Sequence, residues 1–384
     1  MPIRKISVYA ILLVLVPLSF VEAVSIPGTI DSYHAHPPIH SYMNSAAIPQ
    51  GLSPNDIKAA YNLPATGGSG TIAIISAFHH KDIENDLAIF SSEFNLPQCT
   101  VKNKCLEVHQ MASTIKTDSG WDMETALDSQ WAHAIAPKSK LLIVEAVNDS
   151  GTELMKAVDY ASSRSGVVSI SMSWGGDEFK SETKLDSHFI SKNGKAAYFA
   201  SSGDDGAGVS WPAASPNVIS VGGTSLILSE TKSKTGKLMI KMNSEKAWNG
   251  SGGGVSAYES APAYQKDYSI PRSNGMRAIP DVSFAADPQY GFSVYHNDKG
   301  PGGKNSGWNV IGGTSAGAPQ WAAINSLGKG ILLTTLYKDK DSSNNSAYFR
   351  DIVSGKNGSC AYYCSARKRY DYVTGLGSPV TWRF

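Results

Sequence analysis

Short, continuous runs of apolar residues alternate with longer stretches of helical periodicity from Ser53 onward. The runs are shorter than helices and lack the polar alternation of a strand with one wet face. They are therefore typical of strands buried on both faces of a parallel sheet. These runs cover residues 71–75, 141–144, 167–171, 196–200 and 218–221.

Helices are expected between these strands, over residues 83–94, 121–134 and 152–163. A further helix should begin after Ser53-Pro54, because serine caps a helix and proline fits its first turn. Neither an internal repeat nor a second domain boundary is visible after Ser53. The pattern predicts one α/β domain over residues 53–384, with helices packed around a central parallel sheet.

Residues 1–23 have the features of a signal peptide, because a short basic start precedes an apolar run that ends at Val21-Glu22-Ala23. That run is shorter than the roughly 20 residues that cross a bilayer, and no later run is long and apolar enough. We therefore expect a secreted, extracellular protein with no membrane attachment after signal cleavage. An uncleaved anchor is the alternative.

Residues 24–52 are rich in Pro, Ser and His and show no apolar periodicity. They are expected to form an extended leader that is too short to fold as a domain of its own. Its histidines, His34, His36 and His40, could bind a metal. A solvated tail is the favoured interpretation, because no cysteine or carboxylate cluster accompanies them.

Charge and cysteine content narrow the class of protein. Basic and acidic residues nearly balance, at 34 against 33, and no polycationic run supports nucleic-acid binding. Cys99 with Cys105 and Cys360 with Cys364 form two close pairs, which in an exported protein favour two short disulfides. A zinc site is the alternative, although neither pair has the two-residue gap of a zinc knuckle.

A glycine-rich string over residues 311–319 contains Gly313-Thr314-Ser315 and precedes an apolar helix over residues 320–327. Glycine lets the backbone approach a substrate, and a serine at a helix N-terminus lies beside free amide donors. Ser315 is therefore a candidate nucleophile beside part of an oxyanion site. The tripeptide alone would be better explained by a helix cap, but the full string with Pro319 four residues on is much rarer.

A serine nucleophile needs a base, and no histidine of this chain lies in a His-Gly-Thr context. Glu124 and Asp128 are better candidates, because their i, i+4 spacing puts both carboxyls on one helix face. Two carboxyls in a poorly solvated pocket cannot easily both ionise, so one pKa should rise and the pair should titrate as a unit. The alternative is an acidic pair that faces solvent, but apolar Leu127 and Trp131 favour burial.

An apolar strand ends in a third acidic element, Ser202-Gly203-Asp204-Asp205. Turns at the carboxyl ends of parallel strands are where α/β sheets bind substrates. A protonated aspartate there could donate a hydrogen bond to a developing oxyanion, whereas an ionised one would repel it. Activity confined to acid pH is therefore expected.

Three motifs in chain order resemble those of the sedolisin family of serine-carboxyl peptidases. They are Glu124-x-x-x-Asp128, Ser202-Gly203-Asp204 and Gly313-Thr314-Ser315-x-x-x-Pro319. The resemblance extends from about Ser53 to Pro379. It implies a subtilisin-like three-layer sandwich and hydrolysis of polypeptide substrates through an acyl-enzyme.

The resemblance also implies a role for each residue. Ser315 would be the nucleophile and Glu124 the base and then the acid. Asp128 would orient Glu124, and Asp204 rather than Asp205 would donate to the oxyanion. The edge to which a substrate backbone adds as a strand would be Ser173-Trp174-Gly175.

One structural calcium ion near the C-terminus is implied as well. The resemblance makes Asp351 and Asp371 side-chain ligands, and Ile352, Arg367 and Arg369 carbonyl ligands. Oxygen ligands of this kind suit Ca²⁺. The family usually has glycine at the two arginine positions, and arginine loses the freedom of glycine at positive φ and adds positive charge. Calcium binding could therefore be weaker or altered.

Relatives of this kind usually carry a long N-terminal domain that assists folding and blocks the site, and residues 24–52 are too short to replace it. An acid-acting endopeptidase is the main expectation. The alternatives are a tripeptidyl exopeptidase, a weak or inactive secreted peptide-binding homologue, and a subtilisin with an unrecognised histidine. A monomer is the default expectation.

Overall fold

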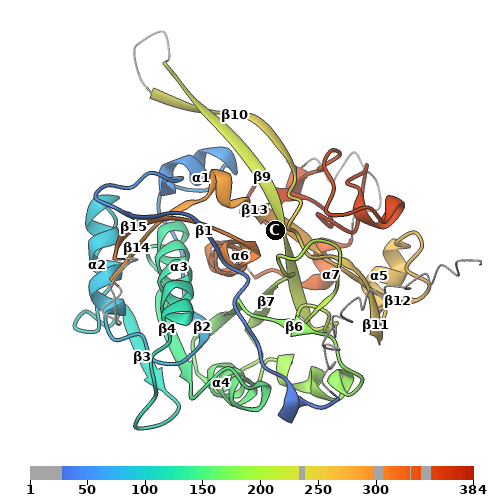
Figure 1. The fold of residues 1–384 in the computed structure, drawn as a ribbon, viewed down its shortest axis with the longest axis horizontal. Helices are drawn as coiled ribbons and strands as arrows, with labels where there is room; N and C mark the ends of the chain where they lie inside the picture. The colour runs from blue at the N-terminus through green and yellow to red at the C-terminus, as the bar shows by residue number, and fades with distance from the viewer. Residues whose placement is uncertain (1–27, 233–237, 298–305, 329, 339–346) are drawn as a thin grey trace, which may run out of the picture.

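The computed structural model describes residues 28–232, 238–297, 306–328, 330–338 and 347–384. Within them, the central sheet has the strand order β10-β9-β7-β5-β2-β4-β3, with β13 beside β9 (Figure 1). The pairings are parallel, apart from the antiparallel pair of β9 with β10. The strands are β2 (Thr71–Ala77), β3 (Leu106–Gln110), β4 (Lys140–Ala146), β5 (Val167–Met172), β7 (Ala197–Ser201), β9 (Val218–Lys232), β10 (Leu238–Ala247) and β13 (Val282–Ala285).

The predicted strands are all present, as β2, β4, β5, β7 and the first part of β9. Strand β9 is much longer than its apolar run, because it continues as one arm of a hairpin with β10 that projects from the body of the molecule (Figure 1). A strand of a projecting hairpin needs no continuous apolar run, so the sequence pattern marked only its buried part.

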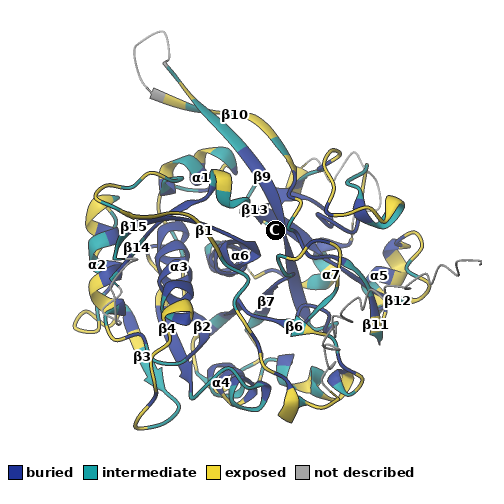
Figure 2. Cartoon of the chain, viewed as in Figure 1, coloured by how far each residue is buried: buried dark blue, intermediate teal, exposed yellow. Residues whose placement is uncertain are grey.

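Helices cover both faces of the sheet, which confirms the expected three layers. Helices α3 and α6 pack on one face and on each other, whereas α4 packs on the other face. Figure 2 shows α6, and α3 beyond its exposed first two residues, buried over most of their length, as expected for helices enclosed by other elements. The helices are α1 (Pro54–Ala60), α2 (Ile83–Glu93), α3 (Ser119–Ile135), α4 (Gly151–Ser163), α5 (Ala263–Tyr268), α6 (Gly317–Leu327) and α7 (Leu333–Leu336).

Smaller sheets and short 3₁₀ helices complete the fold. Strand β15 lies between β1 and β14, and the other small sheets are the pairs β11–β12, β6–β8 and β16–β17. Their bounds are β1 (His40–Ala46), β6 (Gly176–Asp177), β8 (Ser210–Trp211), β11 (Gly254–Ser260), β12 (Met276–Ile279), β14 (Phe292–His296), β15 (Gly307–Gly312), β16 (Phe349–Arg350) and β17 (Ser378–Pro379). The 3₁₀ turns are η1 (Ile30–Ser32), η2 (Glu182–Phe189), η3 (Pro288–Tyr290), η4 (Thr314–Ala316) and η5 (Ala361–Cys364).

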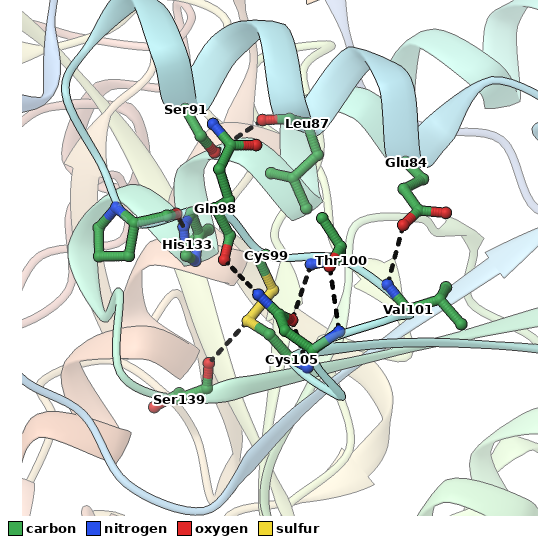
Figure 3. Close-up of a disulfide and its surroundings, with 12 residues drawn as sticks. Glu84, Leu87, Ser91, Gln98, Cys99, Thr100, Val101, Cys105, His133 and Ser139 are labelled. Carbon is green, nitrogen blue, oxygen red and sulfur yellow. Dashed lines mark hydrogen bonds between the residues drawn. A yellow bond between two sulfur atoms is a disulfide. The ribbon is translucent and has the colours of Figure 1, made fainter.

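Both predicted disulfides are present, Cys99–Cys105 and Cys360–Cys364. Figure 3 shows the first in the loop between α2 and β3, where the loop backbone is also held by side chains. The Asn103 side chain donates to the carbonyl of Gln98 at 2.8 Å. With the sulfurs bonded to each other, the zinc interpretation of the cysteine pairs does not apply.

The segment over residues 28–46 differs from the solvated tail that the sequence suggested. It lies across the molecule from η1, beside α4, to β1 (Figure 1, blue). Tyr33 and Ala35 are buried, and β1 pairs antiparallel with β15. We call this segment the strap. Its contacts are with loops and with strand β15 rather than with one apolar face, so they leave no apolar periodicity in the sequence.

The predicted signal peptide lies outside the described residues. Within the described part of the chain, no helix has both the length and the apolar character needed to cross a membrane.

Candidate active site

Helix α3 carries two buried carboxyls on the face that packs against η4 and α6. Glu124 and Asp128 are only 2% and 1% exposed. Burial raises the pKa of both groups, and the charge of Asp128 raises the pKa of Glu124 further. Neither oxygen of Glu124 makes a well-oriented hydrogen bond among the described residues, although the nearby Ser315 hydroxyl lowers its pKa. The pair therefore has the proton affinity that the sequence predicted.

Ser315 lies in η4, the single turn that joins β15 to α6. It is fully buried, and its hydroxyl donates to the carbonyl of Ser173 at 3.4 Å. This position brings the nucleophile predicted from the sequence to the two carboxyls of α3.

Ser173 has a side-chain contact that sequence reasoning missed. Its hydroxyl donates to Asp128 Oδ1 at 2.7 Å and lies 3.2 Å from the carbonyl oxygen of Ser315. It follows directly after β5, at the carboxyl end of a central parallel strand, and that location was the available signal for a role of its side chain. Ser173 therefore links the carboxyl pair to the turn that holds Ser315.

Trp174 and Gly175, the other two residues of the predicted substrate edge, differ in the groups that they present to a partner. The Trp174 side chain is buried, and its indole nitrogen donates to the carbonyl of Ile75 at 3.0 Å. Only its backbone could therefore contribute to an edge. Gly175 does present both backbone groups, and they pair with His36 of the strap.

Asp204 follows β7 and contacts Thr314, the residue before Ser315. Its Oδ1 accepts hydrogen bonds from the amide and the hydroxyl of Thr314, at 2.8 and 2.7 Å. Burial raises the pKa of Asp204, although the hydrogen bonds from His40 and Thr314 act in the opposite direction. Asp205 is exposed, so the geometry favours Asp204 as the acid of this turn.

Gly313 allows this close packing. Its φ of +123° lies in a region that favours glycine. A Cβ at this position would lie 2.6 Å from Asp204 Oδ2 and 2.2 Å from the carbonyl oxygen of Pro38. Any side chain here would therefore separate the acid from the nucleophile turn.

The residues expected to hold calcium form a second acidic site. Asp371 is buried, and both of its oxygens accept hydrogen bonds from its own loop, including the Arg367 amide at 3.1 Å. Asp351 accepts the Arg369 amide at 2.9 Å through Oδ2, and its Oδ1 is buried without a donor among the described residues. That bare carboxylate oxygen fits a hard cation.

The structure shows how the two arginine positions are accommodated beside this site. Arg369 does adopt a positive φ of 67°, the conformation that glycine provides in the family pattern. The Arg367 guanidinium lies 4.0 Å over the ring of Tyr362. Its charge is therefore engaged with an aromatic ring.

The sequence pattern of the subtilase family matches residues 112–329, more than half of the chain. The chain belongs to the subtilase family. Sphericase, at 21% identity and a TM-score of 0.52 over 87% of this chain and 98% of its own, shares the subtilase fold.

Within this fold the sedolisin resemblance is confirmed. The chain is 30% identical to kumamolisin of Bacillus sp. (strain MN-32) over 88% of its length, and 28% identical to sedolisin of Pseudomonas sp. (strain 101) over 94%. It covers 63% and 67% of those two proteins. The structure of Pseudomonas sedolisin in complex with pseudo-iodotyrostatin superposes with a TM-score of 0.69, at 27% identity, over 87% of this chain and 96% of that one. These relatives are serine-type peptidases, so the chain belongs to a family of such enzymes.

Proposed function

We propose that this chain is a secreted, acid-acting serine-carboxyl endopeptidase. The observation that carries the proposal is the grouping of Glu124, Asp128 and Ser315 in one buried cluster, with Asp204 held beside the nucleophile turn by Thr314. Packing and stability alone would not require three carboxyls and one serine to lie together in this way.

In the proposed reaction, ionised Glu124 takes the proton of the Ser315 hydroxyl as the oxygen attacks the peptide carbonyl. Protonated Asp204 donates a hydrogen bond to the oxyanion that forms. Glu124 then gives the proton to the departing amine, which leaves an acyl-enzyme on Ser315. Water then attacks the acyl-enzyme while Glu124 takes its proton, and Glu124 returns that proton to the Ser315 oxygen as the carboxylic acid product is released. Asp128, held by the Ser173 hydroxyl, keeps Glu124 oriented and shares its proton.

The proposal requires activity at acid pH for a definite reason. Asp204 is useful only while protonated, and its raised pKa extends the protonated range upward from the ordinary value. Activity should therefore be present in acid and be lost as the pH rises through the folded-state pKa of Asp204. At the low end, activity should fall once both carboxyls of the Glu124/Asp128 pair are protonated.

Polypeptide is the proposed substrate, because Gly175 offers one N–H and one C=O in the strand geometry that an extended peptide can pair with. A Dictyostelium discoideum protein named tripeptidyl-peptidase 1 is 30% identical over 85% of this chain. A tripeptidyl exopeptidase is therefore the alternative. Cleavage of a peptide with a blocked N-terminus would separate the two, since only an endopeptidase should cut it.

We also propose one structural calcium ion held by Asp351, Asp371 and the carbonyls of Ile352, Arg367 and Arg369. The buried bare oxygen of Asp351 supports it. When bound, such an ion neutralises two carboxylates and so stabilises the loop that carries them. Secretion is supported by the two disulfides, which persist in oxidising compartments.

The experiment that tests the peptidase proposal measures cleavage of an unfolded protein across pH 3–8 for the parent, Ser315→Ala and Glu124→Gln. Both variants should lose cleavage by at least about a thousandfold, because nucleophile and base act as a unit. Glu93→Gln, an exposed glutamate on α2, is the control and should match the parent. Cleavage by a folded Ser315→Ala protein at the parent rate would reject the assignment. A neutral or alkaline optimum would favour a histidine-based subtilisin.

A further inference from the structure

Three buried side chains of types that commonly bind metal ions meet beside α2. His80 follows β2, Asp86 lies in the first turn of α2, and His296 is the last residue of β14. They are only 3%, 0% and 1% exposed, and a possible ligand atom of each lies within 4.8 Å of those of the other two. Figure 1 shows α2 and β14 next to each other at the edge of the molecule, so the fold brings these residues together from segments that are far apart in the sequence.

The contact between His80 and Asp86 has the spacing of two metal ligands. His80 Nε2 lies 3.3 Å from Asp86 Oδ2. The two atoms are not aligned as a hydrogen bond, and Nε2 is buried with no hydrogen-bond partner among the described residues. A buried donor next to a carboxylate normally points at it. A tetrahedral ion with bonds of about 2.0–2.1 Å, by contrast, holds its ligand atoms about 3.3–3.4 Å apart, which is the separation found here.

Asp86 has one oxygen that the described residues leave unsatisfied. Its Oδ2 accepts a hydrogen bond from the Asn297 amide at 3.1 Å, but its Oδ1 is buried without a donor among those residues. A fully buried carboxylate is costly unless hydrogen bonds or a cation compensate its charge. A ligating carboxylate typically keeps an outer hydrogen bond of the kind that Asn297 supplies. Both features of Asp86 are therefore those of a carboxylate that binds a cation.

The two histidines are held in place around this carboxylate. The rings of His80 and His296 meet edge-on, with 5.4 Å between their centroids. The His80 backbone is fixed by Glu145, whose Oε1 accepts the His80 amide at 3.0 Å. His80 Nδ1 lies 3.2 Å from the Asp82 amide, a contact that has to open when Nε2 binds an ion, because Nδ1 then carries the ring proton. Metal binding would therefore replace one long hydrogen bond with a metal–nitrogen bond.

The types of ligand indicate which ion the cluster would hold. Imidazole nitrogens suit Zn²⁺ and related transition metals, whereas Ca²⁺ and Mg²⁺ prefer oxygen ligands. Zn²⁺ often takes three protein ligands and completes a tetrahedron with water. Two histidines and one aspartate match that set. The cluster thus differs in chemistry from the proposed calcium site, whose ligands are all oxygens.

We propose that His80, Asp86 and His296 form a structural site for one Zn²⁺ ion. The ion joins the loop after β2, the start of α2 and the end of β14. Strand β14 pairs with β15, and β15 leads into the turn that holds Ser315, so the ion stabilises the strands behind that turn. The site does not depend on the peptidase proposal, since it needs neither the Ser315 hydroxyl nor a substrate.

The test titrates the protein with zinc chloride at pH 7.5 and follows binding by calorimetry. The chain is prepared without a histidine tag, stripped with a chelator and returned to excess calcium, so that the proposed calcium site is filled. One Zn²⁺ per chain should bind and raise the melting temperature. Asp86→Asn keeps the shape of the side chain and an oxygen for the Asn297 amide. It should bind zinc at least about 100-fold more weakly, because loss of an outer-shell partner alone costs about 10–100-fold.

His188→Gln is the matched control. His188 also lies next to an aspartate, with its Nδ1 3.0 Å from Asp159 Oδ1, but it belongs to neither group of three possible ligands found among the described residues. The control should bind zinc like the parent, and His80→Gln should lose binding like Asp86→Asn. A parent that binds no zinc, or an Asp86→Asn protein that binds it as tightly as the parent, would show that His80 and Asp86 form only an ion pair.

A spectroscopic measurement on the parent avoids any effect of substitution on folding. Co²⁺ can replace Zn²⁺, and its visible absorption is strong in a tetrahedral site and weak in an octahedral one. Co²⁺ bound to the parent should give the strong spectrum, and excess Zn²⁺ should remove it. A weak, octahedral spectrum would mean that water and surface groups hold the ion, and would overturn the proposal. Neither measurement uses peptidase activity, so this proposal and the peptidase proposal succeed or fail separately.

Discussion

Replacing Glu182 by glutamine should make the protein more stable at neutral pH. Glu182 begins η2, is fully buried, and accepts the Phe179 amide at 2.7 Å. Burial, followed by the charge of Glu178, raises its pKa from an ordinary 4.5 to about 9. Glu259 and Asp186 adjoin the same cluster, and burial raises the pKa of Glu259 to about 8. The folded protein therefore keeps a proton on Glu182 that the unfolded chain releases.

The sign and size of the effect follow from proton linkage. Between the unfolded pKa and the folded pKa the native state binds one more proton, so the free energy of unfolding falls as the pH rises. An isolated group would lose about 1.36 kcal/mol per pH unit, or about 2.7 kcal/mol between pH 5 and 7. The neighbouring carboxyls share protons with Glu182, so we expect about half of this, about 1.3 kcal/mol.

Glutamine resembles the protonated acid, because its oxygen can accept from Phe179 and its amide can donate to Glu178. Glu182→Gln should match the parent near pH 4 and be about 1.3 kcal/mol more stable at pH 7. Urea unfolding followed by tryptophan fluorescence at both pH values measures this. Glu230→Gln, an exposed glutamate on β9, is the control and should leave the pH dependence unchanged. Identical pH dependence in Glu182→Gln and the parent would refute the reasoning.

The remaining predictions concern the site and the calcium loop. Asp204→Asn should reduce kcat by about 100-fold, the size of one lost oxyanion donor, and exposed Asp205→Asn should leave kcat unchanged; a similar loss in both would show that Asp204 has no special role. Ser173→Ala should lower kcat by about tenfold. The hydrogen bond from Ser173 lowers the pKa of Asp128, so its loss should raise that pKa and shift the acid limb of the pH–rate profile to higher pH. An acid limb at the same pH as in the parent would contradict a role for this contact. Chelation of calcium should lower the melting temperature of the parent and have a smaller effect on Asp351→Ala, whereas equal shifts would place the ion elsewhere.

The parts of the fold that could be predicted are those whose burial produces a recognisable pattern of apolar residues in the sequence. Strands β2, β4, β5 and β7 are enclosed on both faces and so appear as continuous apolar runs. Glu124 and Asp128 could be paired because helical spacing fixes which residues share a face. Ser315 could be identified as a candidate because it lies in a glycine-rich string.

The parts that could not be predicted depend on contacts between distant segments. Ser173 contacts Asp128 across 45 positions of sequence, and no local pattern records that bond. His40 meets Asp204 in the same way, through a segment whose composition suggested only a solvated tail. The prolines, serines and histidines of the strap have the composition of a linker, but they are ordered because distant parts of the chain supply their partners.

Strand β15 has a partner on each side, β1 and β14, and it ends at the nucleophile turn. If β1 departs, the amides and carbonyls of residues 308–312 that face β1 lose their partners and form an open sheet edge, whereas those that face β14 keep theirs. That edge ends at η4, the turn that contains Ser315. Departure of the strap would thus free two sets of backbone groups at once, those of Gly175 and those along β15, and an extended chain could pair with either.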